Sequence, residues 1–281
     1  MEKIAILTDS GSDLTLEELR ENNVYLAPLN IIYSDGEFED KIDITPNEVY
    51  ASLEREIPKT SLPSTAKIEE ILNKLEEEGY THLIVITISS GLSGTANAIR
   101  LALEDHPKLK SFVYDTKILS MGEGVLVLNT AQMIKEGKSF DEIVEELPKL
   151  RAKTHGYFTI NTLEYLKKGG RIGKVAGTIG EILNLKPIIT VDEDGIYYTY
   201  AKVRGRKQSI NKLAKITKGH LETGKFNVWV LNGGSSKEEE DALFNAVKDF
   251  DNIASISTAE IGPALGVHAG PGLLGVVVQE V

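Results

Sequence analysis

The stretch from Leu83 to Arg100 constrains the fold more than any other part of the sequence. Residues 83–88 form a short β-branched apolar run, and apolar residues return at helical spacing from Ala98 onward, so the sequence predicts a strand followed by a helix. Between them lies a loop of three serines, one threonine and two glycines, Ser89-Ser90-Gly91-Leu92-Ser93-Gly94-Thr95. Such a loop exposes backbone N–H groups and the positive end of a helix dipole. We expect an oxyanion site there, for phosphate, a carboxylate or a reacting carbonyl; the alternative is an ordinary Ser/Thr helix cap.

The first half of the chain repeats this alternation of strands and helices. Strands are expected at Lys3–Leu7, Val24–Tyr33 and Phe112–Tyr114, and helices between them. Helix starts are marked by residues with capping-box spacing, Thr15 with Glu18, Thr45 with Glu48 and Ser139 with Glu142. Alternating βα units build a mainly parallel sheet covered by helices, and ligands bind such sheets at the carboxyl ends of the strands.

The pattern changes after Arg151. Two apolar runs flank Asp194-Gly195, which is a strong signal for a β-hairpin, and three further strands alternate with two helices. The sequence therefore predicts an α/β fold in two domains: a mainly parallel N-terminal domain (1–151) and an α+β domain with an antiparallel or mixed sheet (152–281).

Composition and charge limit the classes of function. The chain of 281 residues has no cysteine, which excludes disulfide and thiolate chemistry, and its net charge of −11 disfavours nucleic acid or an anionic membrane as the main partner. The chain begins as a strand and has no apolar run long enough to span a membrane, so we expect a cytoplasmic protein without stable membrane association. Residues 164–218 carry a local charge of +7, which suits an anionic group, an acidic partner or merely a solvated helix face.

Several familiar motifs are absent or out of context. Residues 270–275 match G-x-G-x-x-G, but they precede an expected strand instead of following one, so a dinucleotide site is not expected. The five histidines include no pair with zinc-helix spacing, and Asp9 with Asp13 is too sparse for a metal site. No metal is therefore expected.

Ser93 invites a second hypothesis, a nucleophile in an acyl hydrolase or transferase. It lies in a strand–turn–helix setting, and Asp115 and His268 follow it in the order typical of α/β-hydrolases. Against this, the final glycine of G-x-S-x-G is missing.

Six motifs in register along nearly the whole chain resemble the DegV family of bacterial fatty-acid-binding proteins. They are Thr8-Asp9-Ser10-x-Ser12-Asp13-Leu14, Lys59-Thr60-Ser61-x-Pro63-Ser64, Ser89-Ser90-Gly91-Leu92-Ser93-Gly94-Thr95, Tyr165-Leu166-Lys167-Lys168-Gly169-Gly170-Arg171-Ile172, Leu183-Asn184-Leu185-Lys186-Pro187 and His268-Ala269-Gly270-Pro271-Gly272.

The resemblance implies a protein that is not itself an enzyme and encloses one long-chain fatty acid between its domains. Some members present the lipid to a separate ATP-binding kinase, which makes an acyl-phosphate for phospholipid synthesis. ATP and Mg²⁺ are then expected only on that partner, and the chain itself needs no cofactor. By resemblance, Thr60 and Ser93 bind the carboxyl group near His268, while Arg171 and Arg204 serve the kinase-facing rim.

The chemistry of a fatty acid fits these residues. Tail burial supplies most of the affinity, and a carboxylate removed from water needs donors on its oxygens. Hydroxyls, backbone N–H groups and the helix N-terminus near Ser93 and Gly94 are expected to supply them, with Thr60 and Ser61 from a second loop.

Two departures from the family pattern concern this head-group site. Leu62 replaces the usual glutamine and Ala269 the usual threonine. Three classes of function follow in order of preference: a lipid-binding carrier, a Ser93-dependent acyl hydrolase or transferase, and a small-anion sensor.

Overall fold

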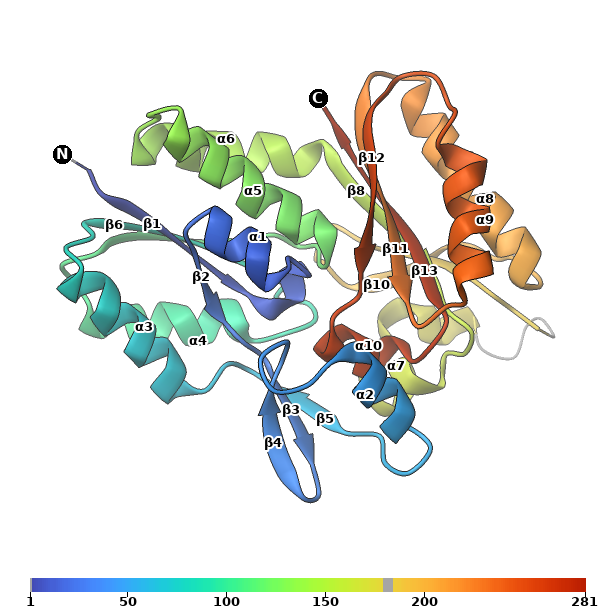
Figure 1. Cartoon of the computed structure of the whole chain (residues 1–281), viewed down its shortest axis with the longest axis horizontal. Helices are drawn as coiled ribbons and strands as arrows, with labels where there is room; N and C mark the ends of the chain where they lie inside the picture. The colour runs from blue at the N-terminus through green and yellow to red at the C-terminus, as the bar shows by residue number, and fades with distance from the viewer. Residues whose placement is uncertain (1, 179–183) are drawn as a thin grey trace.

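The computed structural model describes residues 2–178 and 184–281 and contains three β-sheets (Figure 1). Leu183, the first residue of one of the family motifs, lies outside the described residues. Among the residues described, no helix is both long and apolar enough to cross a membrane.

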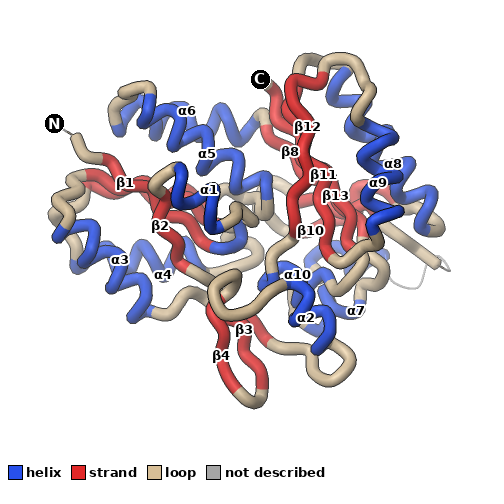
Figure 2. Tube along the Cα trace, viewed as in Figure 1, coloured by secondary structure: helices blue, strands red, loops and turns tan. Residues whose placement is uncertain are grey.

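The first half of the chain forms a four-stranded sheet in which all neighbouring strands are parallel, as the sequence predicted. Its strands, in the order β2-β1-β6-β7, are β2 (Val24–Ala27), β1 (Ile4–Asp9), β6 (His82–Thr87) and β7 (Lys110–Asp115). Every residue from Leu83 to Ile86 is fully buried, because helices cover both faces (Figures 1 and 2).

Two sets of helices cover this sheet. One face packs on α3 (Thr65–Glu77) and α4 (Thr95–Ala102), and the other on α1 (Leu16–Glu21), α5 (Met121–Lys135) and α6 (Phe140–Ala152). The capping boxes expected at the starts of α1 and α6 are both present in full. Short 3-10 helices follow β1 (η1, Ser10–Ser12) and α4 (η2, Leu103–Asp105).

The second half forms a six-stranded mixed sheet in the order β10-β9-β8-β13-β11-β12, in which only β11 and β12 run parallel. Its strands are β8 (Thr154–Thr159), β9 (Ile188–Val191), β10 (Tyr197–Ala201), β11 (Phe226–Gly233), β12 (Ile253–Glu260) and β13 (Leu273–Glu280). The expected hairpin at Asp194-Gly195 is confirmed, since it joins antiparallel β9 and β10.

The two faces of this sheet have different neighbours. One face packs on α8 (Arg206–Leu221) and α9 (Lys237–Val247) in a core of its own. The other face shares a core with α5 and the first sheet, to which Leu273 and Val277 contribute. This shared core joins the two halves of the chain.

A small antiparallel sheet lies beneath both halves in Figure 1. It contains β3 (Asn30–Tyr33), β4 (Gly36–Glu39) and β5 (Lys59–Ser61). We expected one strand from Val24 to Tyr33 and a loop at Thr60 and Ser61; both expectations were wrong. The run breaks after Ala27, and residues 59–61 pair with β3.

Three short helices complete the region under the larger sheets. These are α2 (Pro46–Ser52), α7 (Glu164–Lys168) and α10 (Pro263–Ala269), and the 3-10 helix η3 (Gly173–Thr178) follows α7. α2 begins with the expected capping box and ends at Ser52. Because α2 packs on α10, the first half contacts the second here too, and the division at residue 151 stays a prediction.

Candidate functional site

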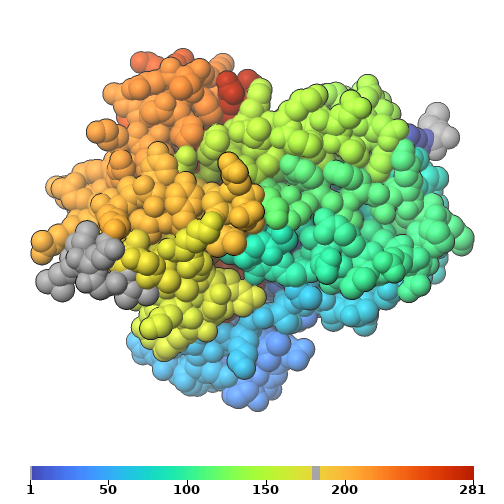
Figure 3. All heavy atoms as spheres, turned by 180° about the vertical axis from the view of Figure 1, so that it is seen from behind, coloured from blue at the N-terminus to red at the C-terminus, as the bar shows by residue number. Residues whose placement is uncertain are grey.

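A cavity of about 280 Å³ lies between the shared core and the small sheet. Seen from behind in Figure 3, the yellow segment after β8 lies against the teal segment near residue 90, so the two halves of the chain are in contact on this face. The described residues that line it are mostly apolar: Leu29, Thr60, Ser61, Leu62, Ile88, Leu92, Ser93, Ile118, Leu119, Ser120, Gly156, Tyr157, Phe158, Leu166, Arg171, Thr190, Val191, Tyr197, Leu231, Ile261, Ala264, Leu265, His268, Ala269, Leu273 and Val277.

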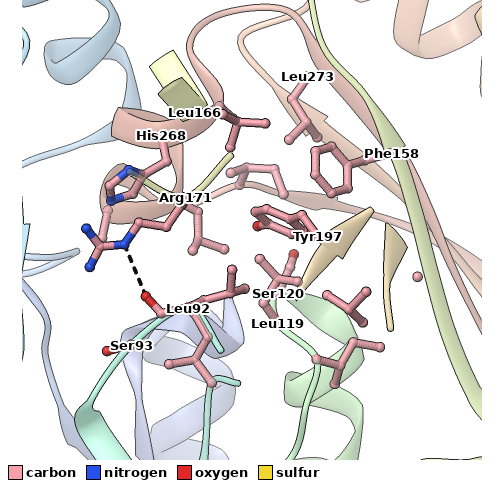
Figure 4. Close-up of a pocket in the computed structure, with 18 of the residues that line it drawn as sticks. Leu92, Ser93, Leu119, Ser120, Phe158, Leu166, Arg171, Tyr197, His268 and Leu273 are labelled. Carbon is pink, nitrogen blue, oxygen red and sulfur yellow. Dashed lines mark hydrogen bonds between the residues drawn. The ribbon is translucent and has the colours of Figure 1, made fainter. Parts of the chain in front are cut away.

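Ser93, Arg171 and His268 lie at one end of this cavity (Figure 4), and we call this the polar end and define it by these residues and Thr60. Ser120 and Tyr197 line the cavity away from this end. The four residues of the polar end come from four separate elements: β5, the loop before α4, the loop after α7, and α10. Among the described lining residues, Arg171 is the only arginine, lysine or acidic side chain. The cavity therefore combines a long apolar wall with one positive charge and several hydrogen-bond donors.

The His268 ring lies between Thr60 and Gly169. Its Nε2 lies 2.7 Å from Thr60 Oγ1, whereas its Nδ1 has no hydrogen-bond partner among the described residues and faces Gly169. Because nothing there accepts a proton from Nδ1, we assign the proton to Nε2, which donates to Thr60 and leaves the Thr60 hydroxyl hydrogen free for a ligand. Burial, and to a lesser extent the charge of Arg171, lowers the pKa of His268 to about 4, so the ring is neutral at pH 7.

Gly169 is required by this arrangement. Its backbone has ordinary helical angles, so φ does not demand glycine. A Cβ atom at Gly169, however, would lie well inside van der Waals distance of His268 Nδ1. The glycine therefore leaves the space in which the His268 ring is held.

Arg171, which was expected on a kinase-facing rim, has its guanidinium at the polar end beside His268 (Figure 4). Its Nε donates to the Leu92 carbonyl at 3.1 Å and its Nη1 to the Gly169 carbonyl at 2.8 Å. These bonds fix the guanidinium across the join between the two halves. Arg204 is exposed and lies outside the described lining.

Ser93 lines the cavity, and its hydroxyl lies 2.8 Å from Thr95 Oγ1 at the start of α4. Several backbone N–H groups of this loop are already bonded within the protein. The N–H groups of Leu92 and Ser93 both donate to the Ser89 carbonyl, and that of Ser90 donates to Asp115. These three N–H groups are therefore occupied, and the hydroxyls of Ser93 and Thr60 are donors that line the cavity here.

The first half of the loop has a structural role. The Ser89 hydroxyl donates to the Gly195 carbonyl at 2.9 Å, and a Cβ on Gly91 would lie 2.7 Å from the same oxygen. Ser89 and Gly91 thus hold the tip of the β9–β10 hairpin against the N-terminal half.

The structure does not assemble the hydrolase triad. The Ser93 hydroxyl bonds Thr95, and His268 Nε2 bonds Thr60. The Asp115 carboxylate pairs with Lys117 and accepts from the Ser90 N–H, so it does not orient the histidine. Without a base bonded to the serine and an acid bonded to that base, the geometry does not support Ser93 as a nucleophile.

The remaining predicted head-group residues divide between the lining and its support. Ser61 lines the cavity, and so do Leu62 and Ala269, the two departures from the family pattern. Gly94 is the N-cap residue of α4 and lies outside the described lining; a Cβ there would contact Leu62 at 3.4 Å.

Four carboxylic side chains are buried behind the cavity. We call Asp9, Asp13, Asp40 and Glu123 the acidic cluster. Burial raises the pKa of Asp9 to about 7 and that of Asp40 to about 6, and it also raises those of the other two. Among the residues described, no group of three or more His, Cys, Asp or Glu side chains has the geometry to hold a metal ion.

The acidic cluster positions α10, the helix that carries His268. Asp13 Oδ1 accepts from the Gly262 N–H at 2.8 Å, and Asp40 Oδ1 from the Ala264 N–H at 3.1 Å. Lys41 pairs with Asp13 and also donates to the Leu14 carbonyl. Sequence reasoning considered Asp9 and Asp13 only as metal ligands and missed this role, since nothing in the local pattern links them to residues 262–264.

The comparisons with known proteins agree on one family. The family model described as "Uncharacterised protein, DegV family" matches residues 3–281. A DegV domain-containing protein of Clostridium acetobutylicum is 51% identical over 281 residues, covering 100% of both chains. The chain belongs to the DegV family.

Solved DegV structures share the whole fold. A DegV family protein from Thermus thermophilus, solved as a fatty-acid-binding protein, has a TM-score of 0.93 and 29% identity, and the match covers 99% of this chain and 100% of that one. A stearic-acid-binding protein from Eubacterium ventriosum has a TM-score of 0.87 and 29% identity, with 99% and 98% covered. The α/β architecture and the family resemblance predicted from the sequence are therefore confirmed.

Proposed function

We propose that this DegV protein binds a long-chain fatty acid, with the tail in the apolar cavity and the carboxylate at the polar end. The observation that carries the proposal is the charge pattern of the lining: apolar throughout most of its length, with Arg171, a neutral His268 and hydroxyl groups at one end. A carboxylate removed from water needs donors of this kind, and burial of each methylene contributes about 0.8 kcal/mol.

The donors have complementary tasks. The Arg171 guanidinium, fixed by two carbonyl oxygens, provides the charge that opposes a carboxylate. The Thr60 hydroxyl donates to one carboxylate oxygen because His268 already donates to its oxygen, and Ser93 donates to the other. The DegV family protein from T. thermophilus and the stearic-acid-binding protein from E. ventriosum bind fatty acids, which supports the same ligand here.

Native mass spectrometry of the purified protein, followed by solvent extraction, tests the proposal. We expect a co-purifying fatty acid and, after its removal, stoichiometric rebinding of palmitic acid. Delipidated protein that binds no fatty acid of any length would overturn the proposal. Esterase activity that disappears in Ser93→Ala would support the acyl hydrolase or transferase instead.

Ser93→Ala tests the orientation of the ligand. Loss of one hydrogen bond to the charged carboxylate is expected to weaken palmitic acid binding by about tenfold to hundredfold while leaving methyl palmitate binding nearly unchanged. Ser90→Ala is the matched control, because the Ser90 hydroxyl accepts from Lys117 and is not part of the lining. Equal loss for the acid and its ester, or no loss at all, would contradict a carboxylate beside Ser93.

The wider role follows from the same site. We propose that the bound carboxylate is presented, in the cytoplasm, to an ATP-binding kinase that makes an acyl-phosphate for phospholipid synthesis. The local charge of +7 over residues 164–218 and the exposed position of Arg204 support an acidic or phosphate-bearing partner surface. Arg204→Ala is expected to lower acyl-phosphate production by the assembled system without changing palmitic acid affinity; unchanged production would rule Arg204 out of this role.

A further inference from the structure

The apolar cavity extends from the polar end along two paired strands. α10, which carries His268, leads directly into β13, so the start of β13 lies near the polar end. β8 pairs antiparallel with β13, with Thr159 opposite Leu274 and Gly156 opposite Val277. At a rise of about 3.4 Å per residue, Gly156 and Val277 lie roughly 10 Å farther along than that first pair.

The next residues on the same face of these strands are polar. Side chains alternate along a strand, so Thr154 and Gln279 share the face of Gly156 and Val277 and lie one step beyond them. Gln279 Nε2 donates to Thr154 Oγ1 at 3.0 Å and to Asn129 Oδ1 at 2.9 Å. Thr154 and Gln279 are buried and lie outside the described lining. Gly156 and Val277 therefore form the end of the apolar wall.

Gly156 differs from the neighbouring glycine on this face. A Cβ on Gly275 of β13 would lie 2.9 Å from the Tyr157 carbonyl oxygen and 3.1 Å from Phe158 Cβ, so packing demands glycine there. A Cβ on Gly156 would meet only ordinary contacts, 3.6 Å to Val277 Cγ2 and 3.7 Å to Ile118 Cδ1. The backbone of Gly156 also avoids positive φ.

Neither backbone nor packing thus explains a glycine at position 156. Glycine in the interior of a strand is unfavourable, because it loses more conformational freedom than other residues and offers no side chain to pack. Because Gly156 has no side chain, it leaves space at the end of the cavity.

We propose that Gly156 sets the longest acyl chain this cavity accepts, by leaving room for the terminal methylenes in front of the polar Thr154–Gln279 pair. The proposal rests on the proposed fatty-acid-binding function and specifies its substrate class. A side chain at position 156 fills that room, so the last carbons of a long acyl chain are excluded from the cavity. A shorter acyl chain does not reach this position and is unaffected.

The test is a chain-length series with delipidated wild type, Gly156→Ala and Gly156→Val. Affinities are measured for lauric, myristic, palmitic, stearic and arachidic acids. Each methylene excluded from the cavity is expected to cost about fourfold in affinity. The longest fatty acid that wild type binds well should therefore lose about fourfold in Gly156→Ala and more in Gly156→Val, while lauric acid binding stays the same.

Two controls separate this outcome from damage to the fold. Gly177→Ala places a methyl group where no heavy atom of the described residues lies within 4 Å, outside the described lining, and should keep the wild-type length profile. The melting temperature of ligand-free Gly156→Ala should equal or exceed that of wild type, since alanine suits this backbone better than glycine.

The outcomes distinguish the two proposals. If wild type binds no fatty acid, the proposed function is wrong and this inference with it. If wild type binds fatty acids but the variants lose affinity equally for every length, or keep the wild-type profile, Gly156 does not set the length and the function stands.

Discussion

The polar end of the cavity and the acidic cluster both place polar groups inside the protein, but with opposite charge and different partners. In the acidic cluster the carboxylates accept from this chain's own backbone: Asp9 from Gly11 and Ile88, and Asp13 from Gly262. At the polar end, donors such as the Thr60 hydroxyl face a cavity whose described lining contains no carboxylate.

The two regions have different roles: the acidic cluster positions α10, and the polar end faces the ligand cavity. One oxygen of Asp13 and one of Asp40 accept from the backbone and fix the position of α10, although their second oxygens have no partner among the described residues. At the polar end, the Thr60 hydroxyl hydrogen is left for a ligand that brings an acceptor. A buried polar group without a partner is costly, so an anionic ligand stabilises the polar end when it binds. Removing groups from each region should therefore change different properties: fold stability in the cluster, and head-group affinity at the polar end.

The largest effect is expected from Asp13→Ala. The Asp13 side chain is fully buried, pairs with Lys41 and accepts from the Gly262 N–H. Removal leaves a buried cation and a buried N–H without this acceptor, which costs about 3 to 5 kcal/mol in comparable pairs. Because Lys41 keeps its bond to the Leu14 carbonyl, the free energy of unfolding measured in urea should fall by about 3 kcal/mol.

Glu17→Ala provides the matched control for Asp13→Ala. Glu17 also pairs with a basic residue, Arg20, but both side chains are largely exposed, so no measurable change in stability is expected. If Asp13→Ala is as stable as Glu17→Ala, the acidic cluster does not hold α10 and the comparison between the two regions fails.

Gly169→Ala should have the next largest effect, on affinity instead of stability. The added methyl group displaces the His268 ring and breaks its bond to Thr60. Losing the oriented Thr60 hydrogen bond to the charged carboxylate costs about 1.5 to 3 kcal/mol, which corresponds to roughly tenfold to hundredfold weaker palmitic acid binding. Methyl palmitate binding should change much less, because it does not rely on head-group donors in the same way.

Gly177→Ala again serves as control, since its methyl group contacts none of the residues that the structure describes. Isothermal titration of the acid and the ester against both variants provides the measurement. Should Gly169→Ala bind the acid as tightly as Gly177→Ala does, the exact placement of His268 is irrelevant to the ligand.

Much of the fold was predictable because its signals are local. Capping boxes at Thr15 and Ser139 and the hairpin at Asp194-Gly195 each satisfy their own hydrogen bonds within a few residues. The strand β5 was not predictable in this way. Its polar sequence, Lys59–Ser61, becomes a strand only because β3, thirty residues earlier, offers an edge to pair with.

The site divides along the same line. Thr60, Ser93, Arg171 and His268 were identified through family motifs, and all four meet at the polar end. The roles of single atoms were not predictable, because they depend on distant neighbours. The Ser89 hydroxyl donates to the Gly195 carbonyl and not to a ligand. Position 169 must be glycine because the ring of His268, 99 residues later in the sequence, lies where a side chain would be.

The smallest expected effect concerns pH and Asp40. Burial raises the pKa of Asp40 from 3.8 to about 6, so the folded state holds this proton more tightly than the unfolded chain does. A raised pKa contributes stability below pH 3.8, and that contribution is lost as the pH rises through 6. Between pH 5 and pH 8, wild type should therefore lose about 1 kcal/mol of stability relative to Asp40→Asn, in which nothing titrates at this position.

The comparison with Asp40→Asn is needed because other groups titrate in the same range. Burial lowers the pKa of His268 and of His155 to about 4, so these rings favour the folded state more as the pH rises, opposite to Asp40. Their contributions are common to both proteins and cancel in the difference between two urea titrations at each pH. Asp9 also titrates in this range, because burial and, to a lesser extent, the charge of Asp40 raise its pKa to about 7, so the difference reports Asp40 together with its effect on Asp9. The side-chain oxygen of asparagine at position 40 can still accept from the Ala264 N–H, so the hydrogen bond that positions α10 is kept. If the two stability curves stay parallel from pH 5 to pH 8, Asp40 is ionised throughout this range in the folded state as well, and burial does not raise its pKa to about 6.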